Sequence, residues 1–512
     1  MTIIRSLNQD IDSVGSTNQL YVDYKRRWRF YLEAYLGGSE WQDGSHLTRY
    51  QLETDAEYRA RIKETPLDNH TRSVVSVYNS FLFRQKPERE FGTLEGNQEL
   101  EDFLKDADLE GRSLDAFMKE VATWANVFGH SFILLTKPNI GAVTRADEVV
   151  NSIRPYVSVL TPLVVLDWSY ERLPSGRYAI DAFKYIEDFN DEIRTVKLWT
   201  NDIIYTWTHD TRSGKEIASM EEPNQLGYVP VITAYANRSI VRGIGVSNVA
   251  DIADMQKFIY NCTSEIAQSI RLDSHPSMVT TPDVNIGTGA GALIHMPETL
   301  DAGLKPYLLE TSGANIDSIY RGIQQSIDAI DKMANTGAVR ATESRSLSGV
   351  AMETEFSLLE AKLSEMADNF ELAEEQMWRI WADYQGTTWT GSVEYPDSFN
   401  IRDTEKEIRQ LQIAASTDPV DSQVKAAIDM RIWQWLDLDD IESDMINGYS
   451  AHIMYSPDGQ AAIVRTEAEH TSLVSQGWTH DYECDCAKSD MKTESDVYVN
   501  GQPINGDTNA SS

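Results

Sequence analysis

The sequence has few cysteines, few basic residues relative to acidic ones, and no long hydrophobic run. Three cysteines in 512 residues, Cys262, Cys484 and Cys486, are too few for a disulfide framework, so we expect synthesis in a reducing cytoplasm. No stretch approaches the roughly 18 apolar residues of a transmembrane helix, so no membrane partner is expected. The first residues lack the basic start and apolar run of a signal peptide, and none is expected.

The shortage of basic residues gives the chain a strongly acidic balance. Lys and Arg number 45 against 80 Asp and Glu, a formal net charge of −35 at pH 7. Such a surface repels nucleic acid at long range, which excludes a protein that wraps DNA with basic side chains. The hydrophobic fraction of 41% is ordinary for a globular protein, and 512 residues allow two to four folding units.

Nucleotide-binding motifs are also missing. The run Gly287-Thr-Gly-Ala-Gly291 suggests a phosphate loop, but the next residues, Ala292 to Pro297, read as an extended segment ending at proline. A phosphate loop needs a helix N-terminus and usually Lys-Ser or Lys-Thr at this place. We therefore expect Gly287, Gly289 and Gly291 to form a turn, and any ATP-driven step to belong to another protein.

The sequence offers no pattern typical of a catalytic or metal site. His480, Cys484 and Cys486 contain one C-x-C pair and no second pair, which is weak support for zinc. The nine histidines are scattered, and no nucleophile-base arrangement stands out. We expect no catalysis, no cofactor and no metal.

Periodicity predicts an α+β fold that is mainly helical. Apolar spacing predicts helices over 17–36, 53–63, 69–83, 113–127 and 246–272, and short helical runs over 405–416, 421–430 and 438–447. Between about 155 and 235, short β-rich runs separated by polar turns predict an antiparallel sheet. Extended pieces are expected over 276–312, between two helices that can lie side by side and present them at their far end.

The segment 314–386 is the most informative part of the chain. A helical run from Ile316 to Met333 ends at Asn335-Thr336-Gly337, and a polar loop, 338–348, separates it from a helix reaching about Gln385. That helix would be roughly 50 Å long. Its apolar stripe includes Met352, Phe356, Leu359, Leu363, Met366, Phe370 and Met377. The stripe could pack against a neighbouring subunit or inside one subunit, and both interpretations stay open.

Several stretches together resemble the portal protein of tailed double-stranded DNA phages, in the branch with a short crown. They are Leu47-Thr-Arg-Tyr50, Glu53 to Arg61, Asn79 to Arg84 with Pro87, Gly227-Tyr-Val-Pro-Val231, Val249 to Ile270, and Ser348-Gly-Val-Ala-Met352 with its long helix. The resemblance covers about residues 20–450, and it rests on the order of these stretches because none is diagnostic alone.

The resemblance implies a ring, usually of twelve subunits, and a division of the chain into parts. These would be a wing (1–240), a descending stem helix (241–272), a clip (273–313), an ascending stem helix (314–334), a tunnel loop (335–348), a long wing helix (349–386) and a crown (387–447). Stem residues would include Ile252, Met255, Ile259, Ile266 and Ile270. The polar tail, 448–512, lies outside the core resemblance and is expected to be partly disordered.

The function that the resemblance implies is that of a conduit. The ring would sit at one capsid vertex, where DNA enters during packaging and leaves at infection, after assembly in the host cytoplasm. Terminase and later a head-tail adaptor would bind the clip, and a major capsid or scaffold protein would be a further partner. The alternatives are a virion connector ring without a DNA channel, and a soluble acidic metalloenzyme, for which no ligand spacing is present.

The tunnel loop would supply the contacts to DNA. Its DNA-facing residues would be Arg340, Thr342, Glu343, Ser344, Arg345 and Ser346. Contact with phosphates is independent of base sequence and screened by salt, which suits a passing duplex. The two arginines could instead pair with Glu343 or with acidic helices. Similarly, the nine acidic residues of the long helix could be an ordinary solvated face or an acidic channel lining.

Overall fold

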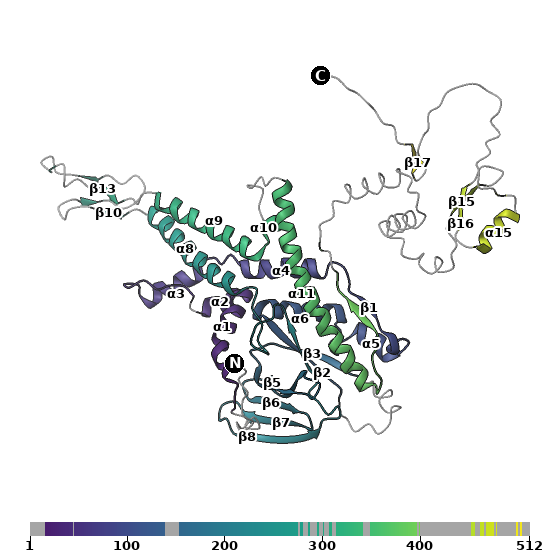
Figure 1. The fold of residues 1–512 in the computed structure, drawn as a ribbon. Helices are drawn as coiled ribbons and strands as arrows, with labels where there is room; N and C mark the ends of the chain where they lie inside the picture. The colour runs from purple at the N-terminus through teal and green to yellow at the C-terminus, as the bar shows by residue number, and fades with distance from the viewer. Residues whose placement is uncertain are drawn as a thin grey trace, which may run out of the picture. The chain divides into compact units, whose positions relative to one another are not determined.

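The fold is described from a computed structural model (Figure 1). It describes residues 16–44, 46–138, 153–274, 314–340 and 349–396 continuously, together with 277–279, 285–286, 294–295, 301, 307–309, 399, 452–455, 461–464, 467–475, 478, 498–499 and 502–503. The chain divides into two compact units, 1–400 and 401–512. Helices and antiparallel sheets are both present, in agreement with the predicted α+β class.

The first part of the larger unit is helical. Its helices are α1 (Gln19–Leu36), α2 (Gly38–Asp43), α3 (Asp55–Glu64), α4 (His70–Leu82), α5 (Gln98–Lys105) and α6 (Leu114–Phe128), with a 3-10 turn at Gly92–Leu94. Local signals fix their ends: Gly37, at φ 63°, ends α1, and Thr54 with Glu57 forms a capping box at the start of α3. The four predicted N-terminal helices are confirmed as α1, α3, α4 and α6.

Two antiparallel sheets follow, as the β-rich runs predicted. One has the order β3-β2-β9, with β2 (His130–Thr136) between β3 (Tyr156–Leu160) and β9 (Val231–Tyr235). The other is a meander of β4 (Val165–Arg172), β5 (Tyr178–Phe189), β6 (Ile193–Thr200), β7 (Ile203–Asp210) and β8 (Glu216–Pro223). The five strands are consecutive in the chain and in space, which is the simplest topology that short turns allow.

Two long helices then form a hairpin. α8 (Ala250–Ser274) and α9 (Ala314–Ala334) pack side by side, and short strands lie at their far end in Figure 1. The strands are β10 (Ser277–Val279), paired antiparallel with β13 (Tyr307–Leu309), and β11 (Asn285–Ile286), paired with β12 (Ile294–His295). The predicted arrangement of two helices presenting an extended insert is therefore what the described residues adopt.

The last helices of this unit run back across its body. After α9 come the short helix α10 (Gly337–Arg340) and the long helix α11 (Gly349–Tyr384). The chain then adds β14 (Ser392–Glu394) to β1 (Glu88–Glu90) in antiparallel register. Because β14 is paired with a strand from the N-terminal part, the beginning of the predicted crown segment packs on the main body.

Two apolar cores hold the larger unit together. One lies where α11 packs over α4, α5, α6 and the three-stranded sheet, and includes Phe117, Phe370 and Trp378. The other joins α1 to the five-stranded sheet and includes Trp28 and Phe183. Each helix and sheet therefore buries one face against the next layer.

The smaller unit carries little described structure. It contains the hairpin β15 (His452–Tyr455) and β16 (Ala461–Val464), the helix α15 (Glu467–Ser475), and the short pair β17 (Tyr498–Val499) and β18 (Gln502–Pro503). The sequence predicted no such elements in its polar tail. The three short helices predicted between 405 and 447 lie outside the described residues, as do residues 504–512.

Candidate functional site

The helix hairpin and the turn that leads from it to α11 contain the predicted stem residues and Arg340. Ile252 and Ile259 on α8 are buried, and Met255 and Ile266 pack partly buried against the core. Ile270, by contrast, is 51% exposed. The predicted apolar stripe of the stem is therefore buried along the first part of α8 and emerges into solvent near its end, where the helix leaves the body.

The turn after α9 is compact rather than an open loop. Asn335 takes a left-handed conformation, φ 56°, which asparagine tolerates better than most residues. The N–H of Thr336 then donates to the carbonyl of Asp331, and the N–H groups of Val339 and Arg340 donate to the carbonyl of Thr336. The predicted polar loop 338–348 is corrected here at its start, because residues 337–340 form α10.

Arg340 is anchored inside this turn. Its guanidinium lies 2.9 Å from the Asp331 carboxylate and 2.7 Å from Nδ1 of His70, at the start of α4. The side chains of Arg340 and Asp331 are only 12% and 7% exposed. Asp68 lies 3.1 Å from the other ring nitrogen of His70, and the hydrogen bond from His70 lowers the pKa of Asp68. Of the two roles considered for Arg340, pairing with an acidic helix is the one seen in this chain.

A second set of hydrogen bonds connects the end of α9 to α4 and α11. Lys362 on α11 donates to the hydroxyl of Tyr78 on α4 at 2.9 Å, and that hydroxyl donates to the carbonyl of Ala334 at 2.6 Å. Burial lowers the pKa of Lys362 to about 8, because an ammonium group is poorly solvated there. Burial likewise raises the pKa of Tyr78 above its usual value. These buried hydrogen bonds therefore connect three helices, α4, α9 and α11.

The remaining residues of the predicted DNA-facing loop and clip turn lie outside the described residues. They are Thr342, Glu343, Ser344, Arg345, Ser346, Gly287, Gly289 and Gly291. Their assignments stay predictions.

The apolar stripe of α11 is buried in the chain's own core. Leu359, Leu363, Met366, Phe370 and Met377 are each at most 2% exposed, and all belong to the core built from α5, α6 and the three-stranded sheet. Phe356 is half-buried, and the side chain of Met352 lies outside the described residues. The predicted subunit-packing role is corrected for the five buried residues, because their own chain already covers them. Packing inside one subunit accounts for this part of the stripe.

The acidic residues of α11 are only partly a solvated face. Glu374 is fully buried and binds Arg89 at 2.5 Å, the hydroxyl of Tyr395 at 2.8 Å and Nε1 of Trp378 at 3.2 Å. Burial alone would lower the pKa of Arg89, but Glu374 and Asp115 beside it raise that pKa above its usual value. Sequence reasoning missed this site, since Glu374 looks like any other glutamate of an acid-rich helix.

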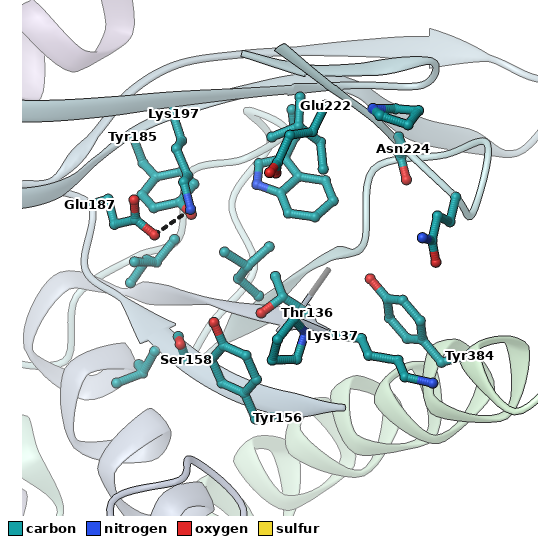
Figure 2. Close-up of a pocket in the computed structure, with 18 residues that line it drawn as sticks. Thr136, Lys137, Tyr156, Ser158, Tyr185, Glu187, Lys197, Glu222, Asn224 and Tyr384 are labelled. Carbon is teal, nitrogen blue, oxygen red and sulfur yellow. Dashed lines mark hydrogen bonds and ion pairs between the residues drawn. The ribbon is translucent and has the colours of Figure 1, made fainter. Parts of the chain in front are cut away.

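A pocket of about 350 Å³ lies between the two sheets (Figure 2). Lys197 and Glu187 form an ion pair of 2.6 Å at its edge, and Tyr156 and Tyr384 lie on the opposite side. Neither histidine nor cysteine lines it. The arrangement therefore pairs no strong nucleophile with a general base.

The described residues contain neither a cluster suited to a metal ion nor a helix suited to a membrane. No group of three or more His, Cys, Asp or Glu side chains in that part of the chain is placed to hold a metal ion. Among the same residues, no helix is both long and apolar enough to cross a bilayer. His480, Cys484 and Cys486 lie outside them.

Comparison with known sequences decides the family. A family profile described as "Phage portal protein, SPP1 Gp6-like" matches residues 45–410, which contain both sheets, the helix hairpin and α11. The chain belongs to this portal protein family. The predicted resemblance is therefore confirmed, and the portal-family chain is a structural connector of the phage virion.

Solved structures and curated proteins add little to the portal assignment. A chain from the structure titled "Virion of native gene transfer agent (GTA) particle" is 12% identical, with a TM-score of 0.40, covering 78% of this chain and 98% of the other. A chain from "Neck of empty GTA particle computed with C6 symmetry" is 11% identical, with the same TM-score, covering 77% and 99%. None of the curated proteins compared with this portal chain matches it.

Proposed function

We propose that this chain assembles into a ring at one vertex of a phage capsid and forms the channel for genome packaging and ejection. The observation that carries the proposal is the family match over residues 45–410. Twelve subunits is the number that the family resemblance favours. The ring would have no chemistry of its own, and the motor that drives DNA would be a separate ATPase.

The parts of the chain fit this role as follows. Residues 1–240 and α11 would form the wing, α8 and α9 the stem, and 273–313 the clip. The proposal for the clip is supported by the strands at the far end of the hairpin, which lie away from the helical body in Figure 1. Such an exposed tip could bind terminase first and a head-tail adaptor later, while the wing would face the major capsid or scaffold protein.

Contact with DNA would be weak, and Arg345 would make most of it. Arg340 already has Asp331 and His70 as partners, so its charge is largely neutralised before any phosphate arrives. One arginine per subunit, repeated around an otherwise acidic ring, gives an attraction that salt screens and that no base sequence modifies. A duplex that must keep moving requires such weak contact.

The ring is tested by imaging the purified full chain. Mass photometry should give a single assembly near twelve subunits, and negative-stain images should show a central hole. A monomer or dimer would contradict the proposal. A closed ring without a hole would instead favour a connector that does not conduct DNA.

A genome-packaging assay tests whether Arg345 contacts DNA and Arg340 instead stabilises the fold. Arg345→Ala should reduce packaging or genome retention while leaving the thermal stability of the ring unchanged. Arg340→Ala should instead lower stability, because Asp331 would lose its guanidinium partner. Normal packaging with Arg345→Ala would show that the charge of this segment does not act on DNA.

A further inference from the structure

The long helix α11 presents a continuous face to solvent beside its buried stripe. Exposed positions of this face recur at steps of four and three, at Thr354, Leu358, Ala361, Glu365, Asp368 and Leu372. Leu358 and Leu372 are 54% and 45% exposed, and the stretch between them is about 21 Å long. Two leucines with carboxylates between them, at this spacing, are typical of a face that packs against another helix.

The carboxylates of this face have no neutralising partner in their own chain. Glu365 and Asp368 are exposed, and within the described part of the chain neither forms an ion pair. Burial raises the pKa of Glu371, one turn from Asp368, and the charges of Glu375 and Asp368 raise it further. The exposed face of α11 is therefore acidic as well as partly apolar, and it attracts a basic partner.

The helix α1 presents the opposite charge. One side of it carries Val22, which is 54% exposed, together with the exposed side chains of Lys25, Arg26 and Arg29. Four of the five residues from 25 to 29 are basic, in a chain whose net charge is −35. Arg29 pairs with Glu33 at 3.0 Å on the same helix. An apolar residue beside cations is the counterpart of leucines beside carboxylates.

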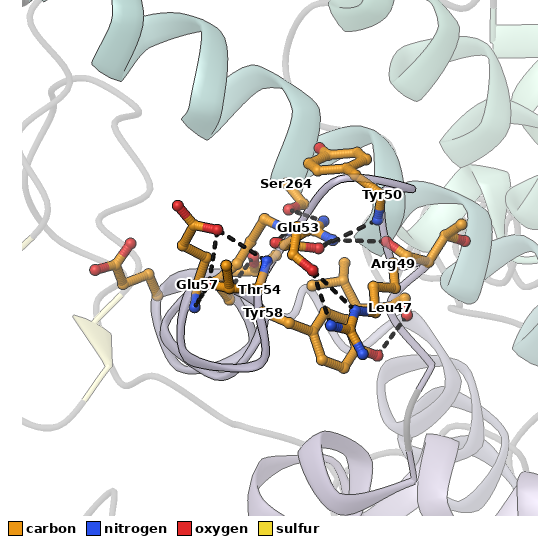
Figure 3. Close-up of polar contacts among 12 residues, drawn as sticks. Leu47, Arg49, Tyr50, Glu53, Thr54, Glu57, Tyr58 and Ser264 are labelled. Atoms are coloured by element: carbon orange, nitrogen blue, oxygen red, sulfur yellow. Dashed lines mark hydrogen bonds and ion pairs between the residues drawn. The ribbon is translucent and has the colours of Figure 1, made fainter.

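Two of these cations are set apart from other basic residues of the helical block by their lack of an acidic partner. Arg61, in contrast, binds both carboxylate oxygens of Glu53 at 2.7 and 2.8 Å, in the turn before α3 (Figure 3). Lys25 lies 5.1 Å from the ring centre of Tyr21. Among the described residues, neither Lys25 nor Arg26 forms an ion pair, so both charges are available to another molecule.

The basic and the acidic face lie on different sides of the larger unit. α11 belongs to one apolar core and α1 to the other, and α4 packs against both helices. In Figure 1, α1 lies on the left of the body and α11 on the right. A head-to-tail ring needs two different, complementary surfaces on different sides of each subunit. Like faces repel each other, so these two surfaces favour head-to-tail contact over a two-fold pair.

We infer that the basic face of α1 in one copy of this chain packs on the exposed face of α11 in the next copy. The inference rests on the proposed ring and identifies two surfaces that close it. The cations of α1 lie against Glu365 and Asp368, and Val22 lies against the leucines. DNA on α1 would occupy the cations but leave the acidic face of α11 without a partner. The buried stripe of α11 thus serves its own subunit, and the exposed face serves the neighbour.

Charge reversal on α1 tests the contact. Lys25→Glu with Arg26→Glu should leave the circular dichroism spectrum and melting temperature of the unassembled chain unchanged, because both side chains are exposed. Ring assembly measured by mass photometry should weaken about tenfold or more, because attraction at every contact becomes repulsion. The matched control is Arg212→Glu with Lys215→Glu, which changes the net charge equally but lies in the exposed turn between β7 and β8. It should assemble normally.

Reversal of both faces together tests which surfaces meet. Glu365→Lys with Asp368→Lys should weaken assembly as the α1 variant does, and the chain with all four substitutions should form rings again, because opposite charges face each other once more. Normal rings in either double variant, or no recovery in the combined one, would overturn this contact and leave the ring intact. Normal rings that retain less genome when α1 is reversed would assign that face to DNA instead. A wild-type chain that never forms rings would overturn the proposed function itself, together with the contact.

Discussion

Replacing Phe370 tests whether the stripe of α11 is the centre of the larger core. Phe370 is completely buried among Met366, Met377 and residues of α5 and α6. Phe370→Ala removes the ring and leaves a cavity, which costs about 3–5 kcal/mol. Domains are typically stable by only about 5–15 kcal/mol, so this variant should fold with much reduced stability. Phe370→Asp adds the cost of a buried, unpaired charge, several kcal/mol more, and should not fold.

The same helix supplies a matched control. Leu372 is 45% exposed and lies two residues along α11, on a different face, so Leu372→Asp should change stability by only about 0.5 kcal/mol. Urea unfolding followed by circular dichroism measures all three variants on the unassembled chain. The reasoning fails if Phe370→Ala costs less than about 1 kcal/mol, or if Leu372→Asp is as damaging as Phe370→Asp.

Three further changes follow from the polar contacts. Asp331→Asn should cost about 3 kcal/mol in urea unfolding, since it breaks a nearly buried pair with Arg340, and a loss below about 1 kcal/mol would show that the pair is not stabilising. The pKa of Lys362 is about 8 in the folded chain against an ordinary value of 10.5, so the unfolded chain binds more protons above pH 8. Stability should therefore rise by about 2 kcal/mol between roughly pH 8 and pH 10, and Lys362→Met should lack this rise. Thr54→Ala should cost about 1 kcal/mol and increase hydrogen exchange at the start of α3, whereas Thr54→Ser should do neither.

The fold could be predicted where a residue pattern is local and repeats along the sequence. α11 and the two helices of the hairpin follow from apolar residues spaced three and four apart over many turns, and the β-rich runs gave the meander. The same periodicity could not say what covers the stripe, because packing within a subunit and packing between subunits require the same residues. Only the positions of α5, α6 and the three-stranded sheet decide this for Leu359 to Met377.

The contacts of the candidate site were less predictable, because the residues that form them are far apart in the sequence. Arg340 meets His70 across 270 residues, and Arg89 meets Glu374 across 285. Nothing in the composition of an acid-rich helix marks one glutamate as buried, and nothing near Arg340 indicates a histidine partner. The resemblance placed a tunnel loop here, but only the contacts show that its first arginine is already engaged.

Three of the buried or nearly buried arginines that the structure describes have one physical consequence in common. Arg61 binds the turn before α3 to α8, Arg340 binds the end of α9 to α4, and Arg89 binds β1 to α11. A guanidinium bound to carboxylates and carbonyls loses its hydrogen bonds when it moves, so these contacts add directional restraint to the apolar packing. Because each helix of the hairpin has such a bond to the N-terminal helices, directional contacts rather than apolar area alone fix the hairpin on the body.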